Sequence, residues 1–358
     1  MIIICIIHSL GIGGMERVMA ILLRHFAQEE EIEIHVVLYG RKREVLQTIP
    51  NPVKVHKPTW AFNNKKRTWH TLKSIAFVRR TVKAIQPDTI LSFGEMWNNL
   101  ALLALIGLPY PIFISDRSKP NKDLGWLQNR LRDRLYPRAA GYIAQTEKAK
   151  DVALQKSWNT NIRVVGNPIP AMDCQQEQEN IILSVGRLIP TKNSDRLIQL
   201  FSRLENAEDW KLCIVGGDAK QMNISQQLAR QVESLGLEDC VILEGAQRNV
   251  KPYYCCSKIF AFMSTSEGFP NVLGEAMAAG CACIAYDCVA GPSDMIDDGI
   301  NGFLIPEGNE KLYLKKLQLL MKDFDLRSKF GKAARKKMKQ FEASEIAGQF
   351  YEFITERL

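Results

Sequence analysis

Continuous apolar runs alternate with helical patterns along most of this chain. The first run, IIICII at Ile2–Ile7, contains no polar residue and leads through a glycine-rich loop into a helical pattern. Strands of a parallel sheet have such runs because helices cover both faces of the sheet, whereas strands with one face in water alternate between apolar and polar residues. The pattern therefore predicts an α/β architecture built on parallel sheets.

The alternation occurs in two series, which predicts two doubly wound, Rossmann-like domains. Strands are expected at residues 2–7, 32–38, 89–93 and 111–115, and then at 181–185, 210–215, 240–243, 259–263 and 282–286. Between the series, Asn167–Gln178 contains two prolines followed by polar residues, which is typical of a linker. We expect domains at 1–168 and 169–340, and a helix at 341–358 that packs back on the first domain. The domains should face a central cleft, because ligands bind beyond the carboxyl ends of such strands.

The charge distribution favours an anionic partner. The formal net charge is +8, and cations cluster within residues 41–80 and 117–138. Such surfaces attract nucleic acid, anionic lipid headgroups or phosphorylated substrates. A solvated basic face without a partner explains any single run equally well. Nucleic acid is not expected as a partner, because the chain contains no recognised nucleic-acid-binding module.

The cysteines and the apolar segments predict a cytoplasmic protein. The nine cysteines show no Cys-x2-Cys pair at zinc spacing, and their odd number indicates reduced, mostly core thiols. The N-terminus, MIIICIIHSL, lacks the basic region and the cleavage site of a signal peptide. The longest apolar run, Leu100–Ile114, is interrupted by two prolines and is too short to span a bilayer.

Glycine-rich loops follow two of the expected strands. HSLGIGGMERV (His8–Val18) places Gly11, Gly13 and Gly14 before a helix, whose N-terminus can bind an anion through free N–H groups. The spacing is not that of the G-x-G-x-x-G dinucleotide motif, and a simple tight turn remains the alternative. IVGGDAK (Ile214–Lys220) places Gly216 and Gly217 after a strand of the second series.

Two cations follow the first strand of the second series, in SVGRLIPTKN (Ser184–Asn193). The guanidinium of Arg187 offers a fork of donors and Lys192 a point charge, and together they can clamp a diphosphate. A solvated basic loop is the alternative. The position at the carboxyl end of a central strand favours the ligand site.

The stretch STSEGFPNVLGEAMAA (Ser264–Ala279) carries Glu267 in a loop and Glu275 in the helix that follows. Asn271 is the expected N-cap, and the N–H groups around Pro270–Leu273 can bind phosphate oxygens. A carboxylate accepts two hydrogen bonds and suits the vicinal diol of a sugar or ribose. The alternative for Glu275 is a favourable interaction with the helix dipole.

These motifs together resemble a known family. EGFPNVLGE, with glutamates separated by seven residues, resembles the signature of retaining glycosyltransferases of the GT-B fold, of the group 1 or family 4 type, which use nucleotide-sugar donors. GGMERV, VGRLIPTKN, AGPSD (Ala290–Asp294) and DDGINGFLIP (Asp297–Pro306) resemble further motifs of the family and occur in the same order. The resemblance covers nearly the whole chain.

The resemblance implies that residues 1–168 form the acceptor domain and residues 169–340 the nucleotide-sugar donor domain. It also implies roles for individual residues. Glu267 would bind the donor sugar, and Arg187 and Lys192 would neutralise the departing diphosphate, so these three form the expected catalytic set. Glu275 would bind the ribose. The other expected donor-binding residues are Gly13, Gly14, Gly186, Gly216, Gly217, Glu244, Arg248, Asn249, Val250, Gly268, Phe269, Pro270, Asn271, Val272 and Leu273. Such enzymes are thought to use front-side attack, so we expect no protein nucleophile, no cofactor and no essential metal.

One segment departs from the family pattern. Many members have a histidine after the strand that corresponds to residues 111–115, whereas this chain has SDRSKP, with Arg117 near that position. An arginine cannot act as a base, but it can hold a phosphate or a sugar oxygen. The expected acceptor contacts are Glu16, Arg17, Glu95, Asn98, Asp116 and Arg117.

The resemblance implies transfer of a hexose or N-acetylhexosamine from a nucleotide sugar, with UDP expected, to a glycan acceptor in bacterial glycan biosynthesis. Related enzymes extend sugars linked to lipid diphosphates. Trp60, Phe62 and Trp69 among the cations of residues 41–80 fit docking to an anionic membrane on the inner face. The alternatives are a nucleotide-sugar epimerase, which would want more acid/base groups than five histidines offer, and a non-catalytic binding subunit. The sequence does not indicate the oligomeric state.

Overall fold

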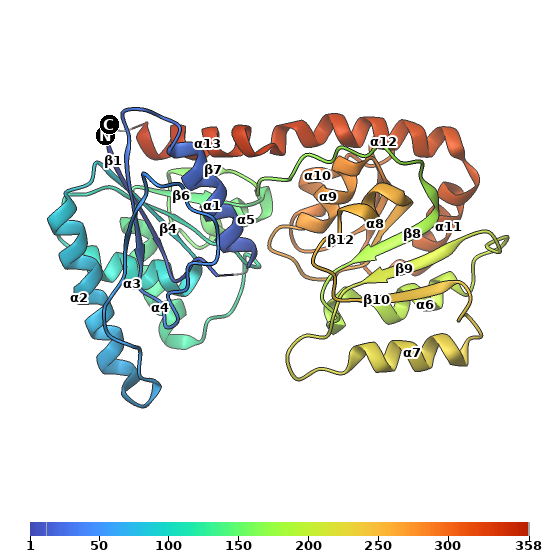
Figure 1. Ribbon diagram of the computed structural model, residues 1–358, viewed down its shortest axis with the longest axis horizontal. Helices are drawn as coiled ribbons and strands as arrows, with labels where there is room; N and C mark the ends of the chain where they lie inside the picture. Colours follow the sequence, from blue (N-terminus) through green and yellow to red (C-terminus); the bar gives the residue numbers. More distant parts are fainter. Residues whose placement is uncertain (12, 357–358) are drawn as a thin grey trace. The chain divides into compact units, whose positions relative to one another are not determined.

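The chain forms two compact units in this computed structural model, which describes residues 1–11 and 13–356. The first unit contains Met1–Pro168 together with Ala343–Leu358, and the second contains Ile169–Glu342. Each unit has one parallel sheet with helices on both faces (Figure 1).

The first unit has a seven-stranded sheet in the order β3-β2-β1-β4-β5-β6-β7. Its strands are β1 (Ile2–Ile7), β2 (Glu33–Leu38), β3 (Lys54–His56), β4 (Thr89–Phe93), β5 (Ile112–Ser115), β6 (Gly141–Ala144) and β7 (Ile162–Val164). Its helices are α1 (Gly14–Phe26), α2 (Arg67–Ile85), α3 (Glu95–Leu105), α4 (Trp126–Leu135), α5 (Glu147–Gln155) and α13 (Ala343–Thr355), with 3-10 turns at Asn64–Lys66 and Tyr136–Arg138. The strand order reverses between β1 and β4, which makes their carboxyl ends a switch point.

The second unit has a six-stranded sheet in the order β10-β9-β8-β11-β12-β13. Its strands are β8 (Glu179–Val185), β9 (Lys211–Val215), β10 (Val241–Gly245), β11 (Ser257–Phe262), β12 (Ala282–Asp287) and β13 (Phe303–Pro306). Its helices are α6 (Ser194–Phe201), α7 (Ile224–Ser234), α8 (Lys251–Cys256), α9 (Asn271–Ala279), α10 (Pro292–Met295), α11 (Glu310–Lys322) and α12 (Phe324–Met338), with 3-10 turns at Pro190–Lys192 and Lys339–Phe341. Here the switch point lies between β8 and β11.

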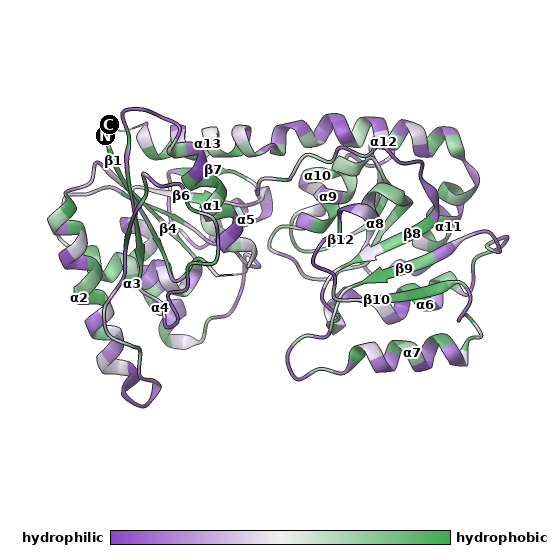
Figure 2. Cartoon of the chain, viewed as in Figure 1, coloured by the Kyte–Doolittle hydropathy of each residue, from purple (hydrophilic) through white to green (hydrophobic). Residues whose placement is uncertain are grey.

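Burial on both faces explains the continuous apolar strands. Ile3–Ile7 of β1 are fully buried, and the strands of both sheets are predominantly hydrophobic (Figure 2). The last helix, α13, belongs to the first unit: Phe350 packs against Phe93 of β4 with ring centroids 5.8 Å apart, and Thr89 donates a hydrogen bond to the carbonyl of Ile354. The chain therefore crosses between the units twice.

The predicted fold class of two doubly wound parallel-sheet domains is confirmed. The sequence patterns missed β3 and β7, which have three residues each, and β6 and β13, which have four. Strands this short lack an apolar run long enough to be distinguished from a loop. Asn271, expected as the N-cap of its helix, is instead the first helical residue of α9, and Pro270 occupies the cap position.

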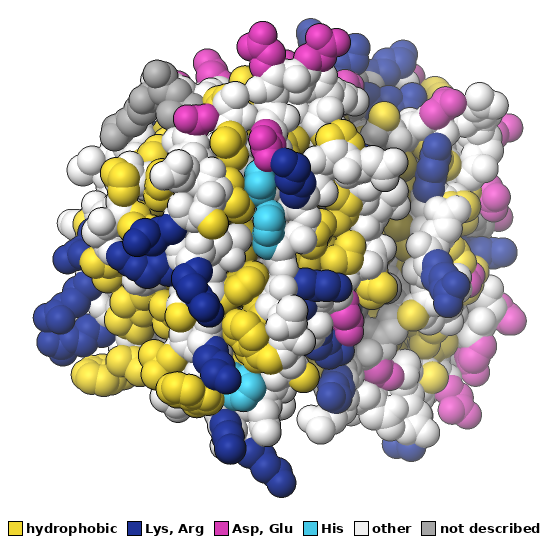
Figure 3. Space-filling view, turned by 60° about the vertical axis from the view of Figure 1, so that its left-hand side comes forward, with side chains coloured by type: hydrophobic (Ala, Val, Ile, Leu, Met, Phe, Trp, Pro, Cys, Tyr) yellow, Lys and Arg dark blue, Asp and Glu magenta, His cyan; other side chains and the backbone are white. Residues whose placement is uncertain are grey.

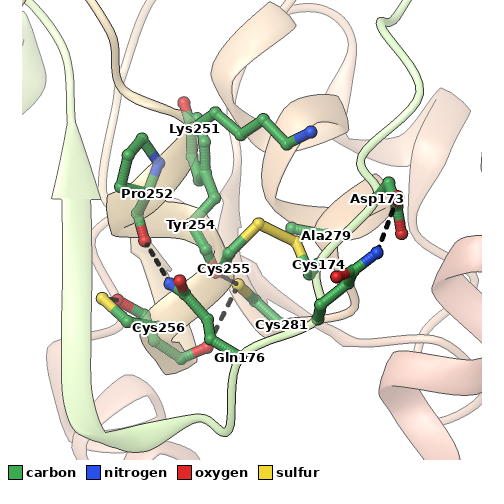
Figure 4. Close-up of a disulfide and its surroundings, with 12 residues drawn as sticks. Asp173, Cys174, Gln176, Lys251, Pro252, Tyr254, Cys255, Cys256, Ala279 and Cys281 are labelled. Carbon is green, nitrogen blue, oxygen red and sulfur yellow. Dashed lines mark hydrogen bonds between the residues drawn. A yellow bond between two sulfur atoms is a disulfide. The ribbon is translucent and has the colours of Figure 1, made fainter.

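The expectation of reduced cysteines is wrong for one pair. A disulfide joins Cys174, in the segment before β8, to Cys255 of α8 (Figure 4). The same segment contacts α8 through Gln176, whose side-chain amide donates to the carbonyl of Pro252 at 3.1 Å. The two cysteines are 81 positions apart, and their Cα atoms come within 5.2 Å only in the folded chain. The other seven cysteines are free thiols.

Candidate active site

An ion pair occupies the switch point of the second unit. Lys192 ends the 3-10 turn after β8, and Glu267 lies in the loop after β11. The ammonium of Lys192 donates to the carboxylate of Glu267, and the two side chains are 18% and 15% exposed. Two residues of the expected catalytic set are thus brought together, and both are within reach of solvent.

Backbone and side-chain hydrogen bonds connect the two loops that carry this pair. The N–H of Thr265 donates to the carbonyl of Thr191 at 2.9 Å. The side-chain amide of Asn193 donates to the carbonyl of Met263 at 2.8 Å. Asn193 has a left-handed backbone (φ 51°), which asparagine tolerates better than most residues. These bonds fix the positions of Lys192 and Glu267, and sequence patterns gave no sign of them.

Glycines bring the backbone at this edge of the sheet into close contact. A Cβ atom at Gly216 would lie 1.8 Å from the carbonyl oxygen of Gly186, so no other residue fits there without movement. The N–H of Leu188 donates to the carbonyl of Gly217 at 2.9 Å. The loops after β8 and β9 therefore form one rigid backbone surface beyond the strands.

Arg187 extends from the same loop as Lys192 and is exposed. In the described part of the chain, no carboxylate lies within ion-pair distance of its guanidinium. An exposed, unpaired arginine beside a partly buried ion pair is free to bind an anionic ligand.

Glu275 lies in the second turn of α9 and is only 6% exposed. The hydroxyl of Tyr254, from α8, donates to its Oε2 at 3.0 Å. This partner orients the carboxylate, and sequence reasoning missed it because an apolar-patterned helix gives no signal for a polar role of its tyrosine. Cys255, the next residue, forms the disulfide described above.

The AGPSD motif (Ala290–Asp294) packs against the loop Glu267–Pro270. Gly291 has φ +101°, and a Cβ atom there would lie 2.1 Å from Cδ of Pro270. Phe269 packs against Phe341 at 5.8 Å between ring centroids. At the start of α9, the N–H groups of Asn271 and Leu273 already donate to the carbonyls of Phe269 and Pro270. Phosphate binding by these two amides, which stays a prediction, would require those bonds to open.

Four expected donor-binding residues lie at or just after the end of β10: Glu244 in the strand, and Arg248, Asn249 and Val250 in the segment before α8. Glu244 accepts a hydrogen bond from the hydroxyl of Tyr253 at 3.0 Å, and Asn249 accepts one from the N–H of Lys251 at the start of α8. Gly217 packs against Ala246. Arg248 is exposed. These residues share the strand-end edge with Gly216, and their contact with a nucleotide stays a prediction.

In the first unit, side chains from the two ends of the glycine loop, His8 and Glu16, contact each other. Gly13 has an extended backbone and caps α1 without a side-chain bond, and Gly14 is the first helical residue. The carboxylate of Glu16 lies 3.3 Å from Nε2 of His8. Burial tends to raise the pKa of Glu16, but hydrogen bonds from His8 and the backbone outweigh it and lower the pKa. The imidazole of His8 stacks on Trp97 with ring centroids 5.1 Å apart.

Three of the expected acceptor residues form a buried network. Oδ1 of Asp116 accepts hydrogen bonds from the side chain of Asn98 at 3.0 Å and from Tyr136 at 2.6 Å. Oε1 of Glu95 accepts from the N–H groups of Arg117 and Ser118. Burial, reinforced by the charge of Glu95, raises the pKa of Asp116 to about 7. These contacts hold the loop after β5 in place, and an acceptor contact by these residues stays a prediction.

The guanidinium of Arg117 is also used inside the first unit. It donates to the side-chain oxygen of Asn167 and lies over the ring of Phe93, with Cζ 4.7 Å from the centroid. Desolvation lowers its pKa to about 9, although nearby acids oppose the shift. Arg117 therefore secures the segment just before the crossing to the second unit.

Within residues 1–11 and 13–356, no group of three or more His, Cys, Asp or Glu side chains is placed to hold a metal ion. The donor set at the switch point of the second unit is instead cationic and acidic, which suits a phosphate beside hydroxyl groups.

Comparisons with known proteins agree with the fold of each unit. Residues 12–171 match the family model described as "Glycosyltransferase Family 4", and residues 174–337 match "Glycosyl transferases group 1". Among solved structures, the lipopolysaccharide outer core galactosyltransferase WaaB is similar at 22% identity and a TM-score of 0.82, covering 100% of both chains. Anabaena Alr3699/HepE in complex with UDP has a TM-score of 0.83 at 18% identity, covering 99% of this chain and 100% of that one.

Two curated relatives come from Campylobacter jejuni. One is named "GalNAc-alpha-(1->4)-GalNAc-alpha-(1->3)-diNAcBac-PP-undecaprenol alpha-1,4-N-acetyl-D-galactosaminyltransferase" and is 28% identical over 98% of this chain and 97% of its own length. The other is an N-acetylgalactosaminyltransferase named for an N,N'-diacetylbacillosaminyl-diphospho-undecaprenol acceptor, and is 28% identical over 97% of this chain and 98% of its own. The two family models together extend over most of the chain, and the chain belongs to the group 1 glycosyltransferases, with the GT-B fold.

Proposed function

We propose that this glycosyltransferase moves a hexose or N-acetylhexosamine, with retention, from a UDP-sugar to a saccharide linked to a lipid diphosphate. The observation that carries the proposal is the Lys192–Glu267 pair at the β8/β11 switch point, with Arg187 beside it. The relatives named for diphospho-undecaprenol acceptors support the acceptor class, and the UDP complex of HepE supports the nucleotide.

Binding of the donor would give the two members of the ion pair separate partners. Lys192 and Arg187 would bind oxygens of the diphosphate, because charge-assisted hydrogen bonds to phosphate are among the stronger polar contacts in proteins. The carboxylate of Glu267, released from Lys192, would accept hydrogen bonds from hydroxyls of the sugar. Glu275, oriented by Tyr254, would accept the ribose hydroxyls.

The chemical step then needs little from the protein beyond charge and position. The bond between the anomeric carbon and the diphosphate oxygen breaks, and the acceptor oxygen bonds to that carbon on the same face. The acceptor proton passes to the departing phosphate. Arg187 and Lys192 would stabilise the charge that develops on the leaving group, which preorganised cations do effectively in a partly desolvated site. We accordingly propose no requirement for a metal or a further cofactor.

The surface of the first unit suits an anionic membrane. Trp69, Leu72, Trp126 and Leu127 are all more than half exposed, which is unusual for side chains of this size. Figure 3 shows Lys and Arg side chains interleaved with hydrophobic ones over this face. In the described residues, no helix is long and apolar enough to cross a bilayer. We propose peripheral binding on the inner face of the membrane, through inserted apolar side chains and attraction of cations to lipid headgroups.

Donor turnover tests the proposed function. The purified protein is incubated with UDP-GlcNAc, UDP-GalNAc, UDP-Glc, UDP-Gal or GDP-Man, with and without a saccharide linked to polyprenyl diphosphate, and nucleoside diphosphate release is measured. We expect release from at least one UDP-sugar and stimulation by the acceptor. Absence of release from every donor would refute the proposal. The relatives give no support to the alternatives of an epimerase or a non-catalytic subunit.

Liposome co-sedimentation tests the membrane proposal separately. We expect binding to vesicles that contain anionic lipid, weaker binding as salt is raised, and little binding to neutral vesicles. Absence of binding to anionic vesicles at low salt would refute the membrane proposal. It would not affect the proposed transfer from a nucleotide sugar.

A further inference from the structure

A cavity of about 570 Å³ lies in the first unit, between α2 and α3 and beyond the carboxyl ends of β1 and β2. We call it the α2–α3 cavity. It is formed by residues of the first unit alone, so it is distinct from the donor residues of the second unit. Its volume is within the range typical of small-molecule sites, which is roughly 300–1,000 Å³.

One wall of the cavity is hydrocarbon. Trp97, Met96 and Leu100 line it from α3, and Tyr39 lines it from the end of β2. The hydroxyl of Tyr39 is already bonded to the carbonyl of Trp97, and the two rings pack edge to face at 5.6 Å, so the tyrosine offers its ring rather than its polar end. This wall suits an apolar chain.

The opposite wall is polar and cationic. Arg67, Thr71 and Ser74 lie at intervals of four and three along α2 and all line the cavity, which places them on one face of the helix. Ser74 is 3% exposed, and its hydroxyl has no hydrogen-bond partner within the described residues. A buried hydroxyl without a partner is costly, and a ligand oxygen would satisfy it.

Arg41 and Lys42, from the loop after β2, join Arg67 at the cavity. In the described part of the chain, the one carboxylate within ion-pair distance of these three cations is that of Glu44, 3.8 Å from Lys42 and exposed. Three cations with so little compensation favour a ligand that carries more than one negative charge.

The hydrocarbon wall continues to the surface. Leu72 and Met96 line the cavity and are 55% and 37% exposed. Gln128 lines it from α4, and the two residues before it, Trp126 and Leu127, are strongly exposed. A chain that enters the cavity can therefore leave along apolar side chains. An amphiphile with a doubly charged head and a hydrocarbon tail fits both walls and this exit.

We propose that the α2–α3 cavity binds the diphosphate and the proximal isoprenoid units of the lipid acceptor. The inference rests on the proposed function for the identity of the lipid. Arg41, Lys42 and Arg67 bind the diphosphate, and the wall formed by Tyr39 and α3 binds the hydrocarbon. The enzyme would then recognise its acceptor by the lipid carrier as well as by the sugar.

Binding of a short analogue tests the site without any donor. Farnesyl diphosphate, farnesol and inorganic pyrophosphate are titrated separately, and affinity is measured by calorimetry and by tryptophan fluorescence, since Trp97 lines the cavity. Farnesol, which lacks the diphosphate, and pyrophosphate, which lacks the hydrocarbon, should each bind about tenfold or more weakly than farnesyl diphosphate. A tenfold loss of affinity corresponds to about 1.4 kcal/mol. Equal binding of pyrophosphate would show a free-phosphate site only, and absence of farnesyl diphosphate binding would also overturn the proposal.

Paired variants assign the binding to the two walls. Arg67→Gln should weaken farnesyl diphosphate about tenfold or more, as expected for loss of one charge-assisted bond. Lys83→Gln, which removes an exposed cation from the same helix outside the cavity, should change it little. Leu72→Glu should weaken binding similarly, whereas Leu154→Glu, an exposed leucine of α5, should not. All four side chains are exposed, so each variant should fold, and thermal melting checks this.

The outcome is separable from that of the proposed function. If transfer to a lipid-linked acceptor occurs but Arg67→Gln and Leu72→Glu match their controls, the cavity assignment fails and the glycosyltransferase function stands. If no nucleotide sugar is turned over but farnesyl diphosphate binds with the expected pattern, the function fails and the cavity assignment stands.

Discussion

In both units, the carboxyl ends of two central strands meet at a switch point: β8 and β11 in the second unit, and β1 and β4 in the first. At the second unit's switch point, a partly exposed lysine–glutamate pair lies on a rigid glycine backbone. At the first unit's switch point, Glu95 and Asn98 are buried in a hydrogen-bonded network, and an aromatic wall lines a cavity beside it.

The difference shows how one topology can present two kinds of ligand. The strand order fixes where a ligand binds, whereas the side chains beyond the strands decide which ligand it is. An ion pair near solvent can exchange its partners for phosphate and hydroxyl groups. A hydrocarbon wall beside three cations, which have one exposed carboxylate within ion-pair distance, instead favours an amphiphilic anion. We therefore propose that the second unit binds the donor and the first unit binds the lipid acceptor.

The largest effect should come from the ion pair. Glu267→Ala removes the carboxylate proposed to bind the sugar and should lower the transfer rate by about 10²–10³ or more, as expected for loss of a group that orients and stabilises the reacting centre. Glu233→Ala, at an exposed position of α7, serves as the control. Circular dichroism and melting should show that both variants are folded. Full transfer activity of the Glu267→Ala variant would refute the proposal that Glu267 binds the donor sugar.

Reduction of the disulfide should have the next largest effect, and only on the second unit. The bridge between Cys174 and Cys255 closes a long loop, and its removal should cost about 2–4 kcal/mol. Calorimetry with and without a reducing agent should show a lower melting temperature for the second unit after reduction. Cys174→Ser should melt at the lower temperature in both conditions, whereas Cys256→Ser should retain the response. An unchanged melting temperature of the second unit after addition of the reducing agent would contradict a stabilising role of the disulfide.

A Cβ atom at Gly216 tests the rigid backbone surface. Gly216→Ala places it 1.8 Å from the carbonyl oxygen of Gly186 and should destabilise the second unit by about 1–3 kcal/mol, with weaker UDP binding. Gly348 of α13 has no atom within 4 Å of the corresponding position, so Gly348→Ala should stabilise the first unit by about 0.5–1 kcal/mol. Chemical denaturation measures both changes. Equal stability of the two variants would show that the contact is unimportant.

The smallest effect should be a pH dependence of the first unit. Because the pKa of Asp116 is raised from 3.8 to about 7, the folded unit keeps a proton that the unfolded chain releases. The protonated carboxyl of Asp116 therefore contributes its full stabilisation of the folded unit below pH 3.8. This stabilisation is lost as the pH rises through about 7. Asp116→Asn keeps an oxygen acceptor for Tyr136 and should flatten this slope. Asp151→Asn, at an exposed position, serves as the control and should retain the fall in stability with rising pH. Melting temperatures between pH 4 and 7 measure the slope for both variants.

The sequence predicted the parts of the molecule that depend on local patterns. Apolar runs such as Ile2–Ile7 identified the strands, and motif spacing identified Lys192, Glu267 and Glu275 as candidates. Contacts between distant residues were not predictable, because no local pattern encodes them. These include the Lys192–Glu267 bond, the Tyr254 partner of Glu275, and the disulfide.

The first unit was harder to predict than the second for the same reason. The α2–α3 cavity takes its lining from the ends of two strands and from three helices, and no single segment signals it. Asn98 and Asp116 were named from their place after strands, but a strand-end position does not distinguish a buried hydrogen-bonded group from one that faces a ligand.

Localisation of UDP by hydrogen exchange tests the division of labour between the units most directly. With saturating UDP, we expect slower amide exchange in the loops after β8, β9 and β11 and at the start of α9, and unchanged exchange in α2 and α3. Farnesyl diphosphate should give the reverse pattern. UDP protection confined to the first unit, or absent at saturation, would contradict the assignment of the donor to the Lys192–Glu267 edge.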